Sequence, residues 1–134
     1  MNLRQMLLLL IGSAVVSCAS TTTETRVDEP LSYEEQIRNA ASVAADQPQV
    51  FVRYNPATCE CPAFEVKMGS RWVRVALNDI NEPDSEAFKL SFRAKQDMEA
   101  NKVPHYGVKG ELGTSTRRCA QDTLYLDLSV ESSD

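Results

Sequence analysis

Apolar and polar residues alternate along most of the chain beyond residue 49, as they do in β-strands that bury one face. Alternating or β-branched runs occupy residues 50–54, 64–68, 71–77, 88–92, 106–112 and 124–130. The segments between them are rich in Asn, Asp, Gly, Pro and Ser, which favour turns. The pattern predicts a mainly β domain.

The clearest element is a β-hairpin. Residues 64–68 and 71–77 flank Gly69-Ser70, a pair suited to a two-residue type II′ turn. Such a short loop fixes the pairing register, and this register places one apolar set on a common face: Phe64, Val66, Val73 and Val75.

The other face of this hairpin is charged and aromatic. In the same register Glu65 lies opposite Arg74, and Lys67 lies opposite Trp72. Cross-strand neighbours of these types attract one another, so we expect an ion pair and a cation–π pair.

Helical periodicity appears before the strands. Ser32 and Glu35 have the spacing of a capping box, and Pro48 ends the segment. Between them one narrow stripe follows the i, i+3, i+4, i+7 pattern: Ile37, Ala40, Ala41 and Ala44. Because this stripe is mostly alanine, it predicts an accessory helix that buries little apolar area.

A second helical segment is predicted within the β-rich region. Phe88, Leu90 and Phe92 alternate with polar residues, which favours a strand, although a helix over residues 86–95 is an alternative. Residues 94–102 then predict a short helix that ends before Pro104.

These elements follow one another as a strand, a hairpin, a further strand, a short helix and two more strands. Counted from the hairpin onward, three strands, a helix and two strands follow the order of the OB-fold. We therefore expect a mainly β (α+β) fold over residues 32–134: a small OB-like five-stranded barrel with one short internal helix and an N-terminal accessory helix. Gly110 suits a tight barrel bend. Other small barrels and α+β sheets fit the same order.

The N-terminus has the layout of an export signal. Arg4 is followed by an apolar stretch from Met6 to Val16, which is too short for the roughly 20 residues of a spanning helix. The residues Val15-Val16-Ser17-Cys18 resemble the lipobox of bacterial lipoproteins. The resemblance covers only this leader. It implies cleavage before Cys18 and lipidation of its sulfur, which would tether the protein to a membrane.

The resemblance divides the chain into a signal peptide (1–17), a flexible tether (18–31) and the domain that follows. Ala19 after the lipidated cysteine implies the periplasmic face of the outer membrane. Ordinary cleavage after Ala19 is the alternative and would release the protein. The tether holds three consecutive threonines and no apolar period, so it cannot bury enough surface to fold.

Charge limits the class of partner. The formal net charge is −5, and loss of Arg4 with the leader moves it to −6. Such a domain repels phosphate backbones, so nucleic acid is not an expected partner. The expected partners are the membrane, through the anchor, and an envelope protein or anionic glycan.

Three cysteines remain beyond Cys18, namely Cys59, Cys61 and Cys119. In an exported, oxidising compartment they are candidates for a disulfide. If the strand at 64–68 lies beside the strand at 105–112, Cys59 and Cys61 both approach Cys119, and the choice of partner stays open. The alternative to a structural bridge is a thiol-redox pair of Cys59 and Cys61, although Glu60 between them would raise the thiol pKa.

No catalytic, metal or cofactor motif stands out. A zinc site that adds His105 to the cysteines is unfavourable, because about 20 Å of extended strand separates His105 from Cys119; we expect His105 on a solvent-exposed rim. OB-like barrels bind ligands on the face of strands two and three, which makes Lys67, Arg71, Trp72 and Arg74 the ligand-binding candidates. The sequence thus predicts a non-catalytic binding or assembly module rather than an enzyme.

Overall fold

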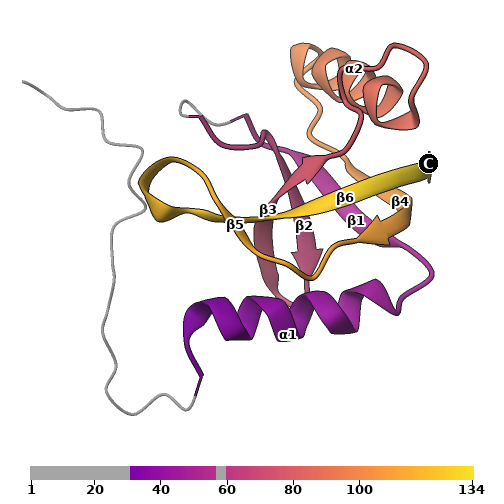
Figure 1. Ribbon diagram of the computed structural model, residues 1–134. Helices are drawn as coiled ribbons and strands as arrows, with labels where there is room; N and C mark the ends of the chain where they lie inside the picture. Colours follow the sequence, from indigo (N-terminus) through magenta and orange to yellow (C-terminus); the bar gives the residue numbers. More distant parts are fainter. Residues whose placement is uncertain (1–30, 57–59) are drawn as a thin grey trace, which may run out of the picture.

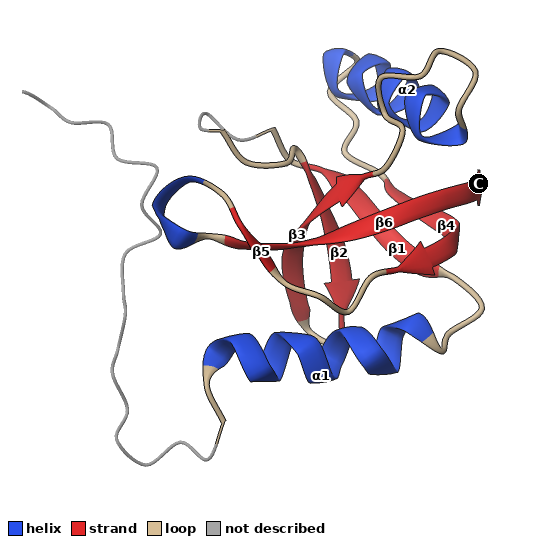
Figure 2. Ribbon diagram, in the orientation of Figure 1, coloured by secondary structure: helices blue, strands red, loops and turns tan. Residues whose placement is uncertain are grey.

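The computed structural model describes residues 31–56 and 60–134. Within these two ranges, two α-helices, six strands and one 3-10 turn follow one another (Figures 1 and 2). Their order is α1 (Tyr33–Ala45), β1 (Val50–Tyr54), β2 (Phe64–Met68), β3 (Arg71–Leu77), α2 (Glu86–Glu99), β4 (His105–Leu112), β5 (Arg117–Arg118), η1 (Ala120–Asp122) and β6 (Leu124–Ser133). The leader, Cys18, the tether to residue 30 and Cys59 lie outside the described residues.

Five strands close into a barrel. β1 pairs antiparallel with β2 and with β4, β2 pairs with β3, and β4 pairs with β6. A parallel pairing between β3 and β6 completes the circle, and the two-residue β5 adds to β6. This is the strand order of an OB-like barrel, so the predicted fold class is confirmed.

The hairpin has the predicted register. Phe64 pairs with Val75, Val66 with Val73, and Lys67 with Trp72. Gly69 supplies the positive φ of 62° that the first position of the turn requires. The apolar face points into the barrel, where it joins the other inward-facing residues of the core: Val52, Tyr106, Val108, Leu126 and Leu128.

The two helices cover opposite ends of the barrel (Figures 1 and 2). α1 begins with the predicted capping box, in which Glu35 N donates to Ser32 Oγ and Ser32 N donates to Glu35 Oε2. It buries Ile37 and Ala41 completely. α2 begins at the N-cap Ser85 and buries its own apolar stripe, Ala87, Leu90 and Ala94.

The predicted strand at 88–92 is wrong and the alternative of a helix over residues 86–95 is confirmed, because residues 86–99 form one continuous helix. The helix predicted at 94–102 is the second half of this element and not a separate helix. Leu90 points inward, whereas Phe88 and Phe92 are exposed. The alternation therefore arises from aromatic residues on the outer helical face. The buried residues follow the helical period instead: Ala87, Leu90 and Ala94 stand at i, i+3 and i+7 and form one inward-facing stripe.

This correction changes which strands build the barrel. Residues 88–92 do not supply a barrel strand, and β1 is the fifth strand instead. β1 lies between β2 and β4, so the neighbour of β4 is β1 and not β2. Gly110 lies at a register shift in the β4–β6 pairing. A Cβ atom there would come within 1.8 Å of the Ser129 carbonyl oxygen, so only glycine allows this approach.

Candidate functional site

The hairpin brings two of the four ligand-binding candidates together on the outer surface of the barrel. Lys67 on β2 lies directly opposite Trp72 on β3. Trp72 is half-buried, and Lys67 is exposed. Within the described part of the chain, Lys67 makes no ion pair and no hydrogen bond through its ammonium group, so its charge is available to a ligand.

Arg53 and His105 complete this surface, and the sequence analysis assigned neither to it. The Arg53 guanidinium lies 4.2 Å from the centre of the Trp72 ring. The His105 ring packs edge-on against the same indole with 4.8 Å between ring centres. We call Arg53, Glu65, Lys67, Trp72 and His105 the Trp72 face. His105 is exposed as expected, but it packs against an aromatic partner rather than standing alone on a rim.

Glu65 fixes the position of Arg53. The Glu65 carboxylate is almost fully buried, and its Oε1 accepts hydrogen bonds from Arg53 Nε at 2.8 Å and from Asn55 Nδ2 at 2.9 Å. The expected Glu65–Arg74 ion pair is therefore replaced by Glu65–Arg53, although Glu65 and Arg74 do pair in the backbone register. Likewise Arg53, not Lys67, is the cation over Trp72.

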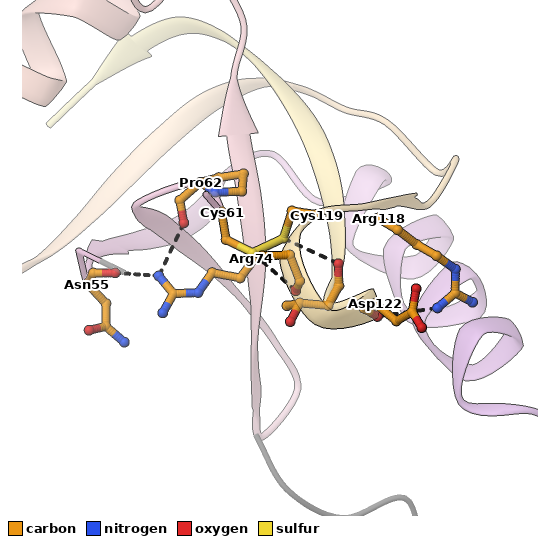
Figure 3. Close-up of a disulfide and its surroundings, with 9 residues drawn as sticks. Asn55, Cys61, Pro62, Arg74, Arg118, Cys119 and Asp122 are labelled. Carbon is orange, nitrogen blue, oxygen red and sulfur yellow. Dashed lines mark hydrogen bonds between the residues drawn. A yellow bond between two sulfur atoms is a disulfide. The ribbon is translucent and has the colours of Figure 1, made fainter. Parts of the chain in front are cut away.

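Arg74 holds the chain between β1 and β2 instead of facing a ligand. Its guanidinium donates hydrogen bonds to the carbonyl oxygens of Asn55 and, at 3.2 Å, of Pro62 (Figure 3). These two residues are the near ends of the β1–β2 connection. Arg74 thus secures that connection beside the disulfide.

Arg71 lies on a different side of the hairpin. Its guanidinium lies 5.6 Å from the centre of the Tyr33 ring and donates to Gln36 Oε1 at 3.3 Å. Both partners belong to α1. Arg71 therefore joins the hairpin to the helix and does not extend the Trp72 face.

A disulfide joins Cys61 to Cys119, 58 residues apart (Figure 3). The expected disulfide is present, but the two cysteines are not brought together by the predicted pairing of the 64–68 strand with the 105–112 strand. β3 connects the two segments, because Arg74 pairs with Glu65 on one side and with Tyr125 on the other. As disulfide sulfurs, Cys61 and Cys119 are not the thiolates that zinc binds.

Clusters of metal ligands and membrane-spanning helices are both absent from the described residues. Across residues 31–56 and 60–134 no group of three or more His, Cys, Asp or Glu side chains is arranged to hold a metal ion. In these same ranges no helix has the length and apolar character needed to cross a membrane. The Trp72 face combines a half-buried aromatic ring, a guanidinium beside that ring and an ammonium with no ionic partner among the described residues.

A correct topology would have revealed the missing members of this surface. Arg53 on β1 pairs directly with His105 on β4, and Arg53 also pairs with Glu65 on β2. Once β1 is placed between β2 and β4, outward-facing side chains at these positions must be neighbours.

Comparisons of the chain with known protein families, with curated proteins and with solved structures found no match.

Proposed function

We propose that this protein is a lipid-anchored module of the bacterial envelope that binds an anionic glycan on its Trp72 face without catalysing a reaction. The proposal joins two independent features. The lipobox-like leader supports an address at the periplasmic face of the outer membrane, and the Trp72 face supports binding.

The observation that carries the proposal is the fixed position of Trp72. The Arg53 guanidinium lies over one part of the indole while it is held by the buried Glu65, and His105 packs edge-on against the indole from β4, so a sugar would stack on the exposed part of the ring. A ring immobilised in this way loses little conformational entropy when a sugar stacks on it. Aromatic side chains with an exposed apolar surface and a nearby polar group are frequent in binding sites.

Charge favours an acidic ligand. The positive charge of Arg53 is compensated by Glu65, which leaves Lys67 as the free cation beside the ring. A single ammonium next to an aromatic platform suits a sugar that carries a carboxylate, as the muramic acid residues of peptidoglycan do. A nucleic acid would need many more phosphate contacts on a domain of the opposite charge.

Binding of soluble peptidoglycan fragments, measured by calorimetry, tests this proposal. Trp72→Ala should weaken binding by about tenfold or more, as expected for a central aromatic contact, and Lys67→Gln by about fivefold. Arg71→Gln is the matched control, because it removes a cation from the same hairpin outside the Trp72 face. Equal losses in Lys67→Gln and Arg71→Gln, or capture of a protein partner with no affinity for glycans, would contradict the proposal.

The anchor is tested separately by Cys18→Ala. If Cys18 carries the lipid, the variant should leave the membrane fraction, because acyl chains supply the membrane affinity. An unchanged distribution and unchanged processing would refute the envelope address.

The disulfide separates this proposal from the thiol-redox alternative. A structural Cys61–Cys119 bridge should persist under mild thiol reductants at neutral pH, whereas an exchanging pair should be reduced readily. Mass spectrometry of alkylated protein distinguishes the two outcomes.

A further inference from the structure

A groove separates α1 from the start of β1 and the end of β2, next to the Trp72 face, with which it shares Lys67. Its volume is about 580 Å³, within the range of small-molecule sites. One wall is a helical stripe of α1, formed by Ala40, Val43 and Ala44, and Gln47 continues it just after the helix. The Trp72 interactions described above do not involve this wall.

The second wall is apolar as well. It is formed mainly by Val50, Phe51 and Met68 from the two strands. Val43 and Phe51 stand on either side of the groove and are 65% and 44% exposed, respectively. Side chains of this size are normally covered when they line a concave surface, so the groove offers an apolar ligand favourable burial.

Lys67 supplies a charge at this groove. It is one of the lining residues, and no lining residue is acidic. Continuing the β1–β2 register by one residue from Val52–Val66 places Lys67 opposite Phe51. A cation thus stands next to an apolar side chain, with two glutamine amides as the remaining polar groups.

We propose that this groove binds a free fatty acid, with the alkyl chain between α1 and the strands and the carboxylate at the Lys67 ammonium. Charge complementarity selects the head group, because the only ionic group in the lining is positive. The apolar walls select the chain. The small side chains Ala40 and Ala44 let an alkyl chain lie close to the helix backbone.

Titration of the full chain with dodecanoate below its micellar concentration tests the inference, with dodecyltrimethylammonium as the control of equal chain length and opposite charge. We expect saturable binding of one dodecanoate per chain, about tenfold tighter than that of the cationic amphiphile. Amide NMR shifts should change at Val43, Phe51 and Gly69. Equal affinity for the two amphiphiles, or shifts centred on other elements, would overturn the inference.

Two variants of α1 localise the site. Val43→Asp places a negative charge at the groove, whereas Ser42→Asp adds the same charge at an exposed neighbour outside its lining. Dodecanoate binding should fall by about tenfold or more only in Val43→Asp. If both variants bind alike, or if Val43→Asp instead abolishes self-association of the chain, the groove is not a fatty-acid site.

A third variant separates this inference from the proposed function. Trp72→Ala should leave dodecanoate binding within about twofold while it weakens glycan binding, and Val43→Asp should do the reverse. Because both sites use Lys67, Lys67→Gln should weaken both activities. Loss of both activities in Trp72→Ala or in Val43→Asp would overturn the inference of a second site beside the Trp72 face.

Discussion

α1 and α2 occupy equivalent places at the two ends of the barrel, but they are attached to it in different ways. α2 is inserted between β3 and β4, and it buries Ala87, Leu90 and Ala94. α1 precedes every barrel strand and buries only Ile37 and Ala41. A helix that buries a longer apolar stripe and is joined to strands at both ends requires more free energy to detach than a preceding helix with two buried side chains.

Polar side chains compensate for the small apolar contact of α1. Besides the Arg71 contacts, Glu34 accepts hydrogen bonds from Thr116 at 2.5 Å and from Arg118 at 2.8 Å. The exposed Arg118 belongs to β5, so the helix is joined to two separate parts of the barrel. Solvent-exposed contacts of this kind are individually weak. The comparison therefore indicates that α1 opens locally and α2 opens only with the whole domain.

The largest effect should come from Leu90→Ala. Truncation of this fully buried side chain should lower the free energy of unfolding by about 3 kcal/mol, through lost transfer free energy and a residual cavity. Denaturant titration should show one cooperative transition at lower denaturant. Phe92→Ala, at an exposed position on the same helix, is the control and should change stability by about 0.5 kcal/mol or less.

Ile37→Ala should lower the free energy of opening α1 by about 2 kcal/mol, because Ile37 is the only large side chain among the fully buried residues of α1. Unlike the Leu90 variant, it should accelerate amide hydrogen exchange in α1 far more than in β4. Equal acceleration in both elements would mean that α1 and the barrel open together.

The two N-caps compare the helices directly. Ser85 Oγ accepts from Phe88 N at 3.0 Å and donates to the Asp79 carbonyl oxygen at 2.6 Å, while Ser32 Oγ accepts from Glu35 N at 3.2 Å. We expect Ser85→Ala to destabilise the domain by about 1–2 kcal/mol in the global transition. Ser32→Ala should lower the free energy of opening α1 by about 1 kcal/mol and should accelerate amide hydrogen exchange only within α1. A global effect from Ser32→Ala would contradict this distinction.

The smallest effect concerns pH. The hydrogen bond from Thr116, followed by the interaction with Arg118, lowers the pKa of Glu34 below its ordinary value of 4.5. The folded protein therefore binds this proton more weakly than the unfolded chain does. The resulting stabilisation of α1 is present above the ordinary pKa and is lost as the pH falls through the lowered one.

Glu34→Gln tests this dependence. In the parent protein, exchange in α1 should accelerate as the pH falls below about 4.5, beyond the change in the intrinsic exchange rate. In the variant this additional acceleration should be reduced. Identical profiles for the two proteins would show that Glu34 does not hold α1 to β5.

Local patterns predicted several elements correctly. The two-residue turn was enough to establish the pairing of Lys67 with Trp72, and the Ser32–Glu35 spacing was enough to establish the start of α1. In both cases the determining residues lie within a few positions of one another. The first half of α2 was predicted as a strand, with a helix as the alternative, because Phe88, Leu90 and Phe92 satisfy the strand period while only Leu90 is buried.

The rest of the Trp72 face required knowledge of the topology. Arg53 and His105 are separated by the hairpin and α2 along the chain, and they meet only because β1 pairs with β4. Such a contact depends on the closure of the whole barrel. Sequence periodicity describes which face a residue occupies, but it carries no information about which strand lies next to it.

The parallel β3–β6 pairing has a consequence for crowding. Each of the five barrel strands described here has a hydrogen-bonded neighbour on both sides, and the additional β5 has only two residues. Open strand edges promote edge-to-edge polymerisation. The closed circle of described strands leaves no long free edge, so copies of this chain at high concentration should not add to one another edge to edge.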